Sequence, residues 1–218
     1  MTINELLTEA REKLTGPDAR LESELLMEAS CGISRTSQFS HTDEELTDKQ
    51  VQQFNEALQR RLSGEPLAYI TGSRGFWDME LRVTADVLIP RPDTECLVEQ
   101  ALERIPPEAD WRIADLGTGS GAIALALARE RQQCELTATD ISASALAIAR
   151  ENAETLGIKN IVFSTGAWTQ ALQTGIYDMI VSNPPYICSE DPHLKQGDLP
   201  AEPEQALASG ADGLDDIR

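Results

Sequence analysis

The stretch RIADLGTGSGAIALALARE, residues 112–130, passes from a strand pattern through a glycine loop into a helix pattern. Residues 112–115 are predicted as a strand and residues 122–131 as the helix that follows it. Gly117, Gly119 and Gly121 allow the backbone between them to turn sharply and to come close to a ligand. The stretch therefore predicts a strand–loop–helix unit that presents its loop to a small molecule.

The same alternation continues toward the C-terminus. A strand is predicted over 135–140, a helix over 143–156, and further strands near 161–164 and 178–182. Strands that alternate with helices in this way form a parallel sheet covered by helices on both faces. We therefore predict an α/β domain over residues 91–218.

The chain before this domain has a different pattern, and residues 1–75 are predicted to be helical. Helices are expected from about residue 3, over 18–31 up to Gly32, and from Thr47 to Gly64. Thr2 with Glu5, and Thr47 with Gln50, have the spacing of capping boxes. The inner stripe of the third helix is predicted to consist of Val51, Phe54, Asn55, Leu58 and Leu62. A small bundle for packing or substrate docking fits this pattern.

A β-hairpin linker is predicted over 76–90, because Met79, Leu81 and Val83 alternate after a possible turn at 76–79. Asp93 is then expected to cap a helix. The inner face of this helix is predicted to carry Leu97, Val98, Ala101, Leu102 and Ile105.

The acidic residue that ends the next strand adds to the evidence from the glycine loop. Asp140 follows Gly121 by 19 residues, where a carboxylate can accept hydrogen bonds from both hydroxyls of a ribose. The G-x-G-x-G spacing of Gly117 to Gly121, with Thr118 and Ser120 between the glycines, differs from the dinucleotide fingerprint G-x-G-x-x-G. It resembles the S-adenosylmethionine loop of class I methyltransferases, and Asp115 would lie near the ammonium group of that cofactor. A plain βα turn, with Asp140 as an exposed helix cap, is the alternative.

A second motif, NPPY at 183–186, ends the last predicted strand. Proline cannot donate to a sheet ladder, so Pro184 and Pro185 stop the strand at the edge where ligands bind. An amide or aromatic amine nitrogen is a poor nucleophile because its lone pair is delocalised. The Asn183 side-chain oxygen and the Pro184 carbonyl can accept its two N–H groups, and Tyr186 can pack on the planar group. The motif predicts methyl transfer to a planar –NH₂ group.

Composition excludes several classes of protein. The chain has 218 residues, a net charge of −19 and 41% hydrophobic residues. The charge disfavours a stable nucleic-acid surface, since phosphate binding relies on lysine and arginine. The four cysteines form no zinc or disulfide pattern, and no signal peptide or membrane span is visible. We expect a cytoplasmic protein, with His41 and His193 as structural or surface residues.

Four stretches together resemble the release-factor glutamine methyltransferases, the HemK-like family. They are IPRPDTE at 89–95, DLGTGSGAIALALA at 115–128, VSNPPYI at 181–187, and EP at 202–203 with ALASGADGL at 206–214. The resemblance implies a Rossmann-like class I S-adenosylmethionine-dependent methyltransferase. Its activity would be methylation of the side-chain amide nitrogen, N5, of the glutamine in the Gly-Gly-Gln motif of class 1 peptide chain release factors.

The resemblance also assigns roles to residues. Gly117 to Gly121 and Asp140 would bind S-adenosylmethionine, Trp168 would pack near the adenine, and Asn183 would touch cofactor and substrate. Residues 183–186 would hold the glutamine amide. Ala167 stands where the family often has an acidic residue, which implies weaker cofactor binding.

Family members usually continue well past residue 218, so a C-terminally truncated sheet with an exposed apolar edge is expected. Two alternatives stay open. An adenine-N6 nucleic-acid methyltransferase shares NPPY and the cofactor, and a non-catalytic cofactor-binding fragment would keep the fold without turnover.

Overall fold

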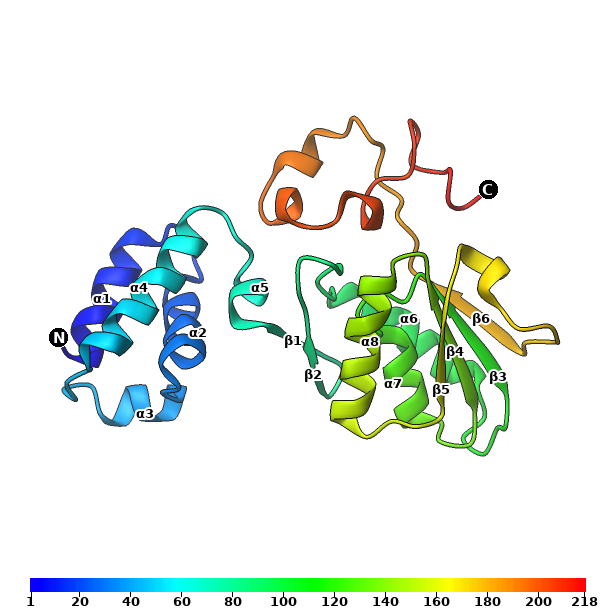
Figure 1. The fold of residues 1–218 in the computed structure, drawn as a ribbon, viewed down its shortest axis with the longest axis horizontal. Coiled ribbons are helices and arrows are strands. Elements are labelled where there is room, and N and C mark those ends of the chain that lie inside the picture. Colours follow the sequence, from blue (N-terminus) through cyan, green and yellow to red (C-terminus); the bar gives the residue numbers. More distant parts are fainter. The chain divides into compact units, whose positions relative to one another are not determined.

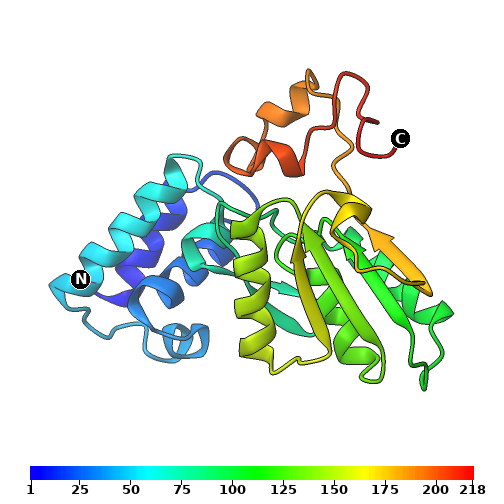
Figure 2. The same ribbon diagram turned by 45° about the vertical axis from the view of Figure 1, so that its right-hand side comes forward.

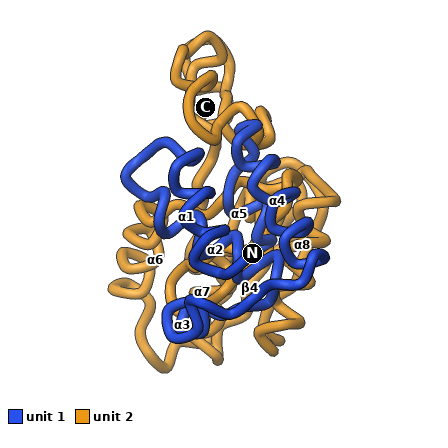
Figure 3. Tube along the Cα trace, turned by 90° about the vertical axis from the view of Figure 1, so that its left-hand side faces the viewer, with its two compact units in different colours: residues 1–72 blue, residues 73–218 orange.

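The computed structural model describes residues 1–218, which divide into two compact units, Met1–Gly72 and Ser73–Arg218 (Figure 3). None of the helices is both long enough and apolar enough to cross a bilayer.

The first unit is a helical bundle. Its helices are α1 (Ile3–Lys13), α2 (Ala19–Cys31), α3 (Arg35–Ser40), α4 (Asp48–Leu62) and α5 (Leu67–Thr71). The capping boxes at Thr2 and Thr47 are both confirmed, since each side chain and its partner three residues on exchange hydrogen bonds with the backbone. The core of the bundle consists mainly of Ile3, Leu6, Leu7, Ala10, Leu26, Met27, Phe54 and Leu58.

Three details of this unit differ from the prediction. The short helices α3 and α5 were not expected from the periodicity, because five or six residues carry too little of a helical pattern to recognise. Helix α4 ends at Leu62, with Ser63 as its C-cap. Leu62 is 42% exposed, so its assignment to the inner stripe was wrong. It occupies the last position of the helix, past the part that buries Leu58.

The second unit begins with an antiparallel hairpin, β1 (Ser73–Phe76) and β2 (Met79–Arg82), which starts and ends earlier than the predicted range 76–90. The predicted alternation is confirmed, because Met79, Leu81 and Val83 are all buried. The hairpin therefore belongs to the core of this unit.

A four-stranded parallel sheet forms the centre of the second unit (Figure 1). Its strands are β3 (Arg112–Leu116), β4 (Glu135–Asp140), β5 (Ile161–Thr165) and β6 (Met179–Ser182), arranged in the order β5-β4-β3-β6. All three pairings are parallel. The predicted α/β fold is confirmed, and the bounds of β4 agree with the prediction. The order reverses at β3, where open α/β sheets bind their ligands at the carboxyl edge.

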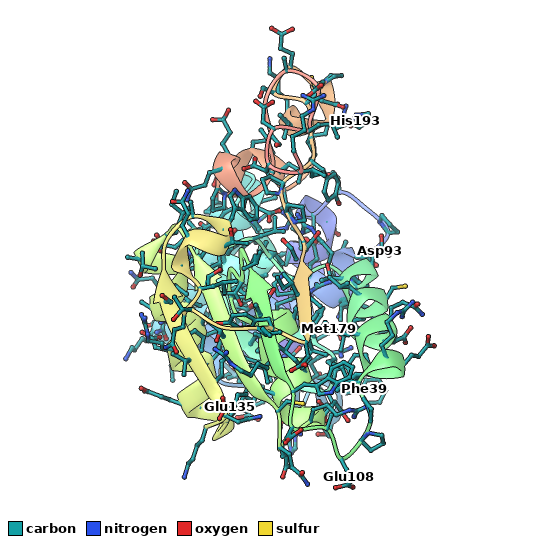
Figure 4. All side chains as sticks on the ribbon, turned by 90° about the vertical axis from the view of Figure 1, so that its right-hand side faces the viewer. Phe39, Asp93, Glu108, Glu135, Met179 and His193 are labelled. Atoms are coloured by element: carbon teal, nitrogen blue, oxygen red, sulfur yellow. The ribbon has the colours of Figure 1, made fainter.

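The prediction of helices on both faces was wrong. Helices α6 (Asp93–Arg104), α7 (Ala122–Glu130) and α8 (Ala143–Leu156) all pack on one face of the sheet (Figure 1). The connection between β5 and β6 contains only the 3₁₀ turn η1 (Trp168–Ala171), so no long helix covers the opposite face there. Val162 and Ile180 on that face are 53% and 51% exposed. Figure 4 shows this open face, with Glu135 near the amino edge of the sheet and Asp93 and His193 toward its carboxyl edge.

Helix α6 begins without the expected side-chain cap. The helix starts at Asp93 itself and Pro92 is its N-cap, so the Asp93 carboxylate caps no backbone N–H group. Proline suits this end because its fixed φ is helical and the missing N–H would have no partner there. The predicted inner face holds in part, since Val98, Ala101 and Ile105 are buried while Leu97 and Leu102 are half-buried.

After β6 the chain forms a segment of short turns, residues 187–218, which we call the C-terminal segment. It contains the 3₁₀ turns η2 (Pro192–Lys195), η3 (Leu199–Ala201) and η4 (Glu204–Ala206). Ile187 pairs with Ala208 in a single parallel bridge inside it. The segment lies beyond the carboxyl edge of the sheet, in orange and red in Figures 1 and 2.

Candidate active site

The glycine loop and NPPY begin at neighbouring strand ends. Leu116 of β3 pairs with Ser182 of β6, and the Ser182 hydroxyl donates to the Leu116 carbonyl at 2.8 Å. The next residues are Gly117 and Asn183, so the pairing of the two strands places both motifs at one edge of the sheet. On the other side of β3, strand β4 ends at Asp140. The sheet order thus brings together three groups that the sequence predicted separately.

The loop depends on glycines at three positions. Gly117, Gly119 and Gly121 have φ angles of +73°, +56° and +89°, a region that side-chain-bearing residues rarely adopt. The Gly119 N–H donates to the Asp140 Oδ2 atom at 2.9 Å, and the Ser142 N–H donates to its Oδ1 atom at 2.9 Å. The Asp140 carboxylate therefore holds the loop and the start of α8 together, while its remaining lone pairs can accept from a ligand.

Asp115 lies beneath the loop. Its side chain is buried, lines none of the three cavities described below, and accepts a hydrogen bond from the Thr118 hydroxyl at 2.6 Å through Oδ2. Its Oδ1 atom has no hydrogen-bond partner. Burial raises the pKa of Asp115 from 3.8 to about 6. The expectation that Asp115 adjoins a cofactor ammonium group remains a prediction.

A buried asparagine that the sequence did not reveal supports the loop from below. The Asn152 amide nitrogen on α8 donates to the carbonyls of Ser120 and Arg82 at 2.9 and 3.0 Å. Its oxygen accepts from the Arg82 N–H at 2.7 Å. Asn152 therefore joins the glycine loop to the end of the hairpin. A lone asparagine within a helix carries no sequence signal for such a role.

The first cavity, of about 160 Å³, lies at the carboxyl edge of the sheet. The predicted cofactor residues that line it are Gly117, Gly119, Asp140, Trp168 and Asn183. Trp168 has a φ of +48°, which is unusual for a bulky residue. Its ring lies beside Gly117, where an added Cβ atom would make an ordinary contact at 3.7 Å from Trp168 Cζ3. We call this space the loop cavity.

A second cavity, of about 290 Å³, contains all four residues of NPPY and is called here the NPPY cavity. Asn183, Pro184 and Pro185 line both cavities, as do Leu88 and Ala206, so the two cavities adjoin at these residues. Tyr186 lines only the NPPY cavity and is 64% exposed. The two motifs are therefore joined through Asn183 and the two prolines.

The remaining predicted residues are placed differently. Thr118 and Ser120 are buried and line a smaller third cavity that also reaches Asn183. Gly121 lines none of the three, because it packs against α7 and α8: a Cβ atom there would lie 2.9 Å from Leu125 Cδ1 and 3.2 Å from Ala149 Cβ. His41 and His193 are both exposed and line none of the cavities, as expected.

Sequence reasoning missed two other groups of lining residues. One is the segment before α6, from which Leu88 lines all three cavities and Arg91 lines the NPPY cavity. The other is the C-terminal segment, from which Leu199, Ala206 and Leu207 line the NPPY cavity. The stretches IPRPDTE and EP in these regions were available as signals, although no chemistry could be assigned to them from their residue types.

Comparison with known proteins supports the same assignment. Residues 5–72 match the family described as PrmC N-terminal domain, and residues 94–201 match the Methyltransferase small domain. The release factor glutamine methyltransferase of Salmonella typhimurium is 50% identical over 218 residues, which is 100% of this chain and 78% of that protein. The chain belongs to the release factor glutamine methyltransferase family.

A second curated relative agrees with this membership. The release factor glutamine methyltransferase of Escherichia coli strain K12 is 49% identical over 97% of this chain and 76% of its own length. The crystal structure of ribosomal protein L11 methylase from Lactobacillus delbrueckii subsp. bulgaricus is 33% identical over 43% of this chain and 47% of that chain, with a TM-score of 0.38.

The matched methyltransferase region contains every predicted site residue, from Gly117 to Tyr186. It ends at residue 201, one residue before Glu202. The part of the C-terminal segment that begins at Glu202 and lines both cavities thus lies outside the matched region.

Proposed function

We propose that this chain methylates the side-chain amide nitrogen of the glutamine in the Gly-Gly-Gln motif of class 1 peptide chain release factors, with S-adenosylmethionine as methyl donor. The observation that carries the proposal is that the loop cavity and the NPPY cavity adjoin at Asn183, Pro184 and Pro185, which line both. A donor on one side and an amide on the other would meet there. The activity belongs in the cytoplasm, where release factors act.

The loop cavity has the chemistry that a nucleoside sulfonium requires. Asp140 supplies carboxylate oxygens for ribose hydroxyls, Trp168 supplies an aromatic surface for adenine, and Gly117 and Gly119 allow close backbone approach. When bound, the cofactor supplies an electrophilic methyl group on a positively charged sulfur.

The NPPY cavity has the groups that an amide nitrogen requires. The Asn183 oxygen accepts one N–H of the substrate amide and the Pro184 carbonyl accepts the other. Two fixed acceptors hold the –NH₂ group in one plane and favour the positive charge that develops on nitrogen during attack. Tyr186 packs on the planar amide, and its exposed position leaves it free to do so. The amide proton leaves after the nitrogen has acquired its fourth substituent, so no strong base is needed.

The two alternatives are less well supported. The net charge of −19 and the pI near 4.4 disfavour a nucleic-acid methyltransferase. The curated relatives are named for an enzymatic activity on release factors, which favours catalysis over mere cofactor binding.

The test is mass spectrometry of an unmethylated class 1 release factor after incubation with the chain and S-adenosylmethionine. The expected product carries one added methyl on the glutamine of Gly-Gly-Gln, and a release factor with alanine in that position gains none. Absence of methylation in the intact substrate, or a methyl on another residue, would refute the proposal.

A further inference from the structure

The C-terminal segment forms part of the wall of both cavities, although it contains no long helix or strand. Leu199, Ala206 and Leu207 line the NPPY cavity, and Pro203, Gln205 and Ala206 line the loop cavity. Its regular structure consists of 3₁₀ turns and a single bridge, Ile187 to Ala208. Short turns of this kind have little intrinsic stability. The position of this wall therefore depends on long-range contacts.

One such contact centres on Glu202, between η3 and η4. The residue is 6% exposed and its side chain is fully buried. Its Oε2 atom accepts a hydrogen bond from the Ile89 N–H at 3.0 Å, and its Oε1 atom forms an ion pair with the Arg91 guanidinium. Both partners lie more than 110 residues earlier, in the IPRPDTE stretch. We call this arrangement the Glu202 clamp.

Prolines stiffen both sides of the clamp. Arg91 lies between Pro90 and Pro92, and Glu202 lies between Pro200 and Pro203. Proline fixes its own φ and restricts the residue before it, so the two backbones lose little freedom when they come together. A buried carboxylate without a partner would be strongly destabilising, so this pairing defines one position of the wall.

We infer that Glu202 is a positioning residue for the reaction: its bonds to Ile89 and Arg91 hold residues 199–207 as the wall of the NPPY cavity against which the substrate glutamine is held. The inference rests on the proposed function. Arg91 also lines that cavity. The clamp therefore joins the wall formed by the segment before α6 directly to the wall formed by residues 199–207.

The clamp acts on substrate binding more than on the chemical step. Asn183 is positioned through the β3–β6 pairing and the bond from Ser182 to Leu116, and the glycine loop through Asp140 and Asn152. None of these contacts involves Glu202. Loss of the clamp therefore leaves the reacting groups in place, while the wall that residues 199–207 contribute to the NPPY cavity and to part of the loop cavity loosens.

The test compares Glu202→Gln and Arg91→Met with Glu204→Gln, a matched control at an exposed carboxylate two residues away that lines neither cavity. Glutamine keeps an acceptor for the Ile89 N–H and removes only the charge. Each clamp variant is expected to raise the KM for the release factor about tenfold, with kcat within about threefold of wild type. The Kd of S-adenosylmethionine should rise less than this KM, because Pro203, Gln205 and Ala206 of the same segment form only part of the loop cavity. The double variant should lose no more than either single one.

The outcomes separate the inference from its alternatives. A merely structural role for Glu202 would lower the folded fraction, which reduces the apparent kcat and leaves KM unchanged. That result would contradict the positioning role of Glu202. An effect of Glu204→Gln equal to that of the clamp variants, or full additivity of the two clamp variants, would contradict it as well. Glu202→Gln, which leaves no buried charge unpaired, keeps the test decisive if Arg91→Met does not fold. No methylation by the wild-type chain would instead overturn the proposed function, and the inference with it.

Discussion

Asp115→Asn should gain stability relative to wild type, within the second unit, as the pH rises from acid to neutral. The wild-type carboxyl is buried, and its pKa is raised from 3.8 to about 6 chiefly by burial, against the hydrogen bond from Thr118. The folded state therefore binds the proton more tightly than the unfolded state. The contribution of the Asp115 carboxyl to the free energy of unfolding is fully present below about pH 4 and is lost as the pH rises through about 6.

The magnitude follows from the two pKa values. The difference between about 6 and 3.8 corresponds to about 3 kcal/mol of unfolding free energy lost between pH 4 and pH 7. Asparagine has nearly the same shape, does not ionise, and can still accept from the Thr118 hydroxyl. The unfolding free energy of the variant minus that of wild type should thus increase by about 3 kcal/mol over this range and stay constant above it.

Urea unfolding, monitored by tryptophan fluorescence, measures this difference in the second compact unit of the chain. All three tryptophans, Trp77, Trp111 and Trp168, lie within Ser73–Arg218. Asp110→Asn makes the same change at an exposed carboxyl and serves as the matched control. A difference that is constant with pH, or that shrinks as the pH rises, would refute the reasoning, because it would mean that the fold does not favour the protonated form of Asp115.

Three further substitutions test the site. Asp140→Ala removes the acceptor for the Gly119 N–H and the proposed ribose contact, so the Kd of S-adenosylmethionine should rise about a hundredfold by calorimetry; an unchanged Kd would contradict the assignment. Asn183→Ala removes a proposed acceptor for the substrate amide, so single-turnover methyl transfer should slow by about a thousandfold while cofactor affinity changes little; near-normal turnover would exclude this mechanism. Asn152→Leu leaves the Ser120 carbonyl and both Arg82 backbone groups without these partners, and should lower the unfolding free energy by about 3 kcal/mol in urea; a neutral result would show that water replaces the amide.

Much of the local structure was predictable because it is encoded within a few neighbouring residues. The bounds of β4 and α8 agree with the predicted ranges 135–140 and 143–156, since alternation and helical periodicity report which side chains face the core. The capping box at Thr47 was visible for the same reason. The order of strands and helices was enough to predict a parallel sheet, which binds its ligands at the carboxyl edge.

The tertiary structure decided the features that depend on distant residues. The burial of Glu202 against Ile89 joins positions 113 apart, and no periodicity carries information over that separation. The open face of the sheet follows from a β5–β6 connection that forms a single 3₁₀ turn, where the alternation of elements led us to expect a covering helix. The sequence by itself therefore determined the elements, the glycine loop and the residues proposed for chemistry, through interactions between near neighbours. Only the folded chain decided which segments enclose them, because packing between remote segments sets that position.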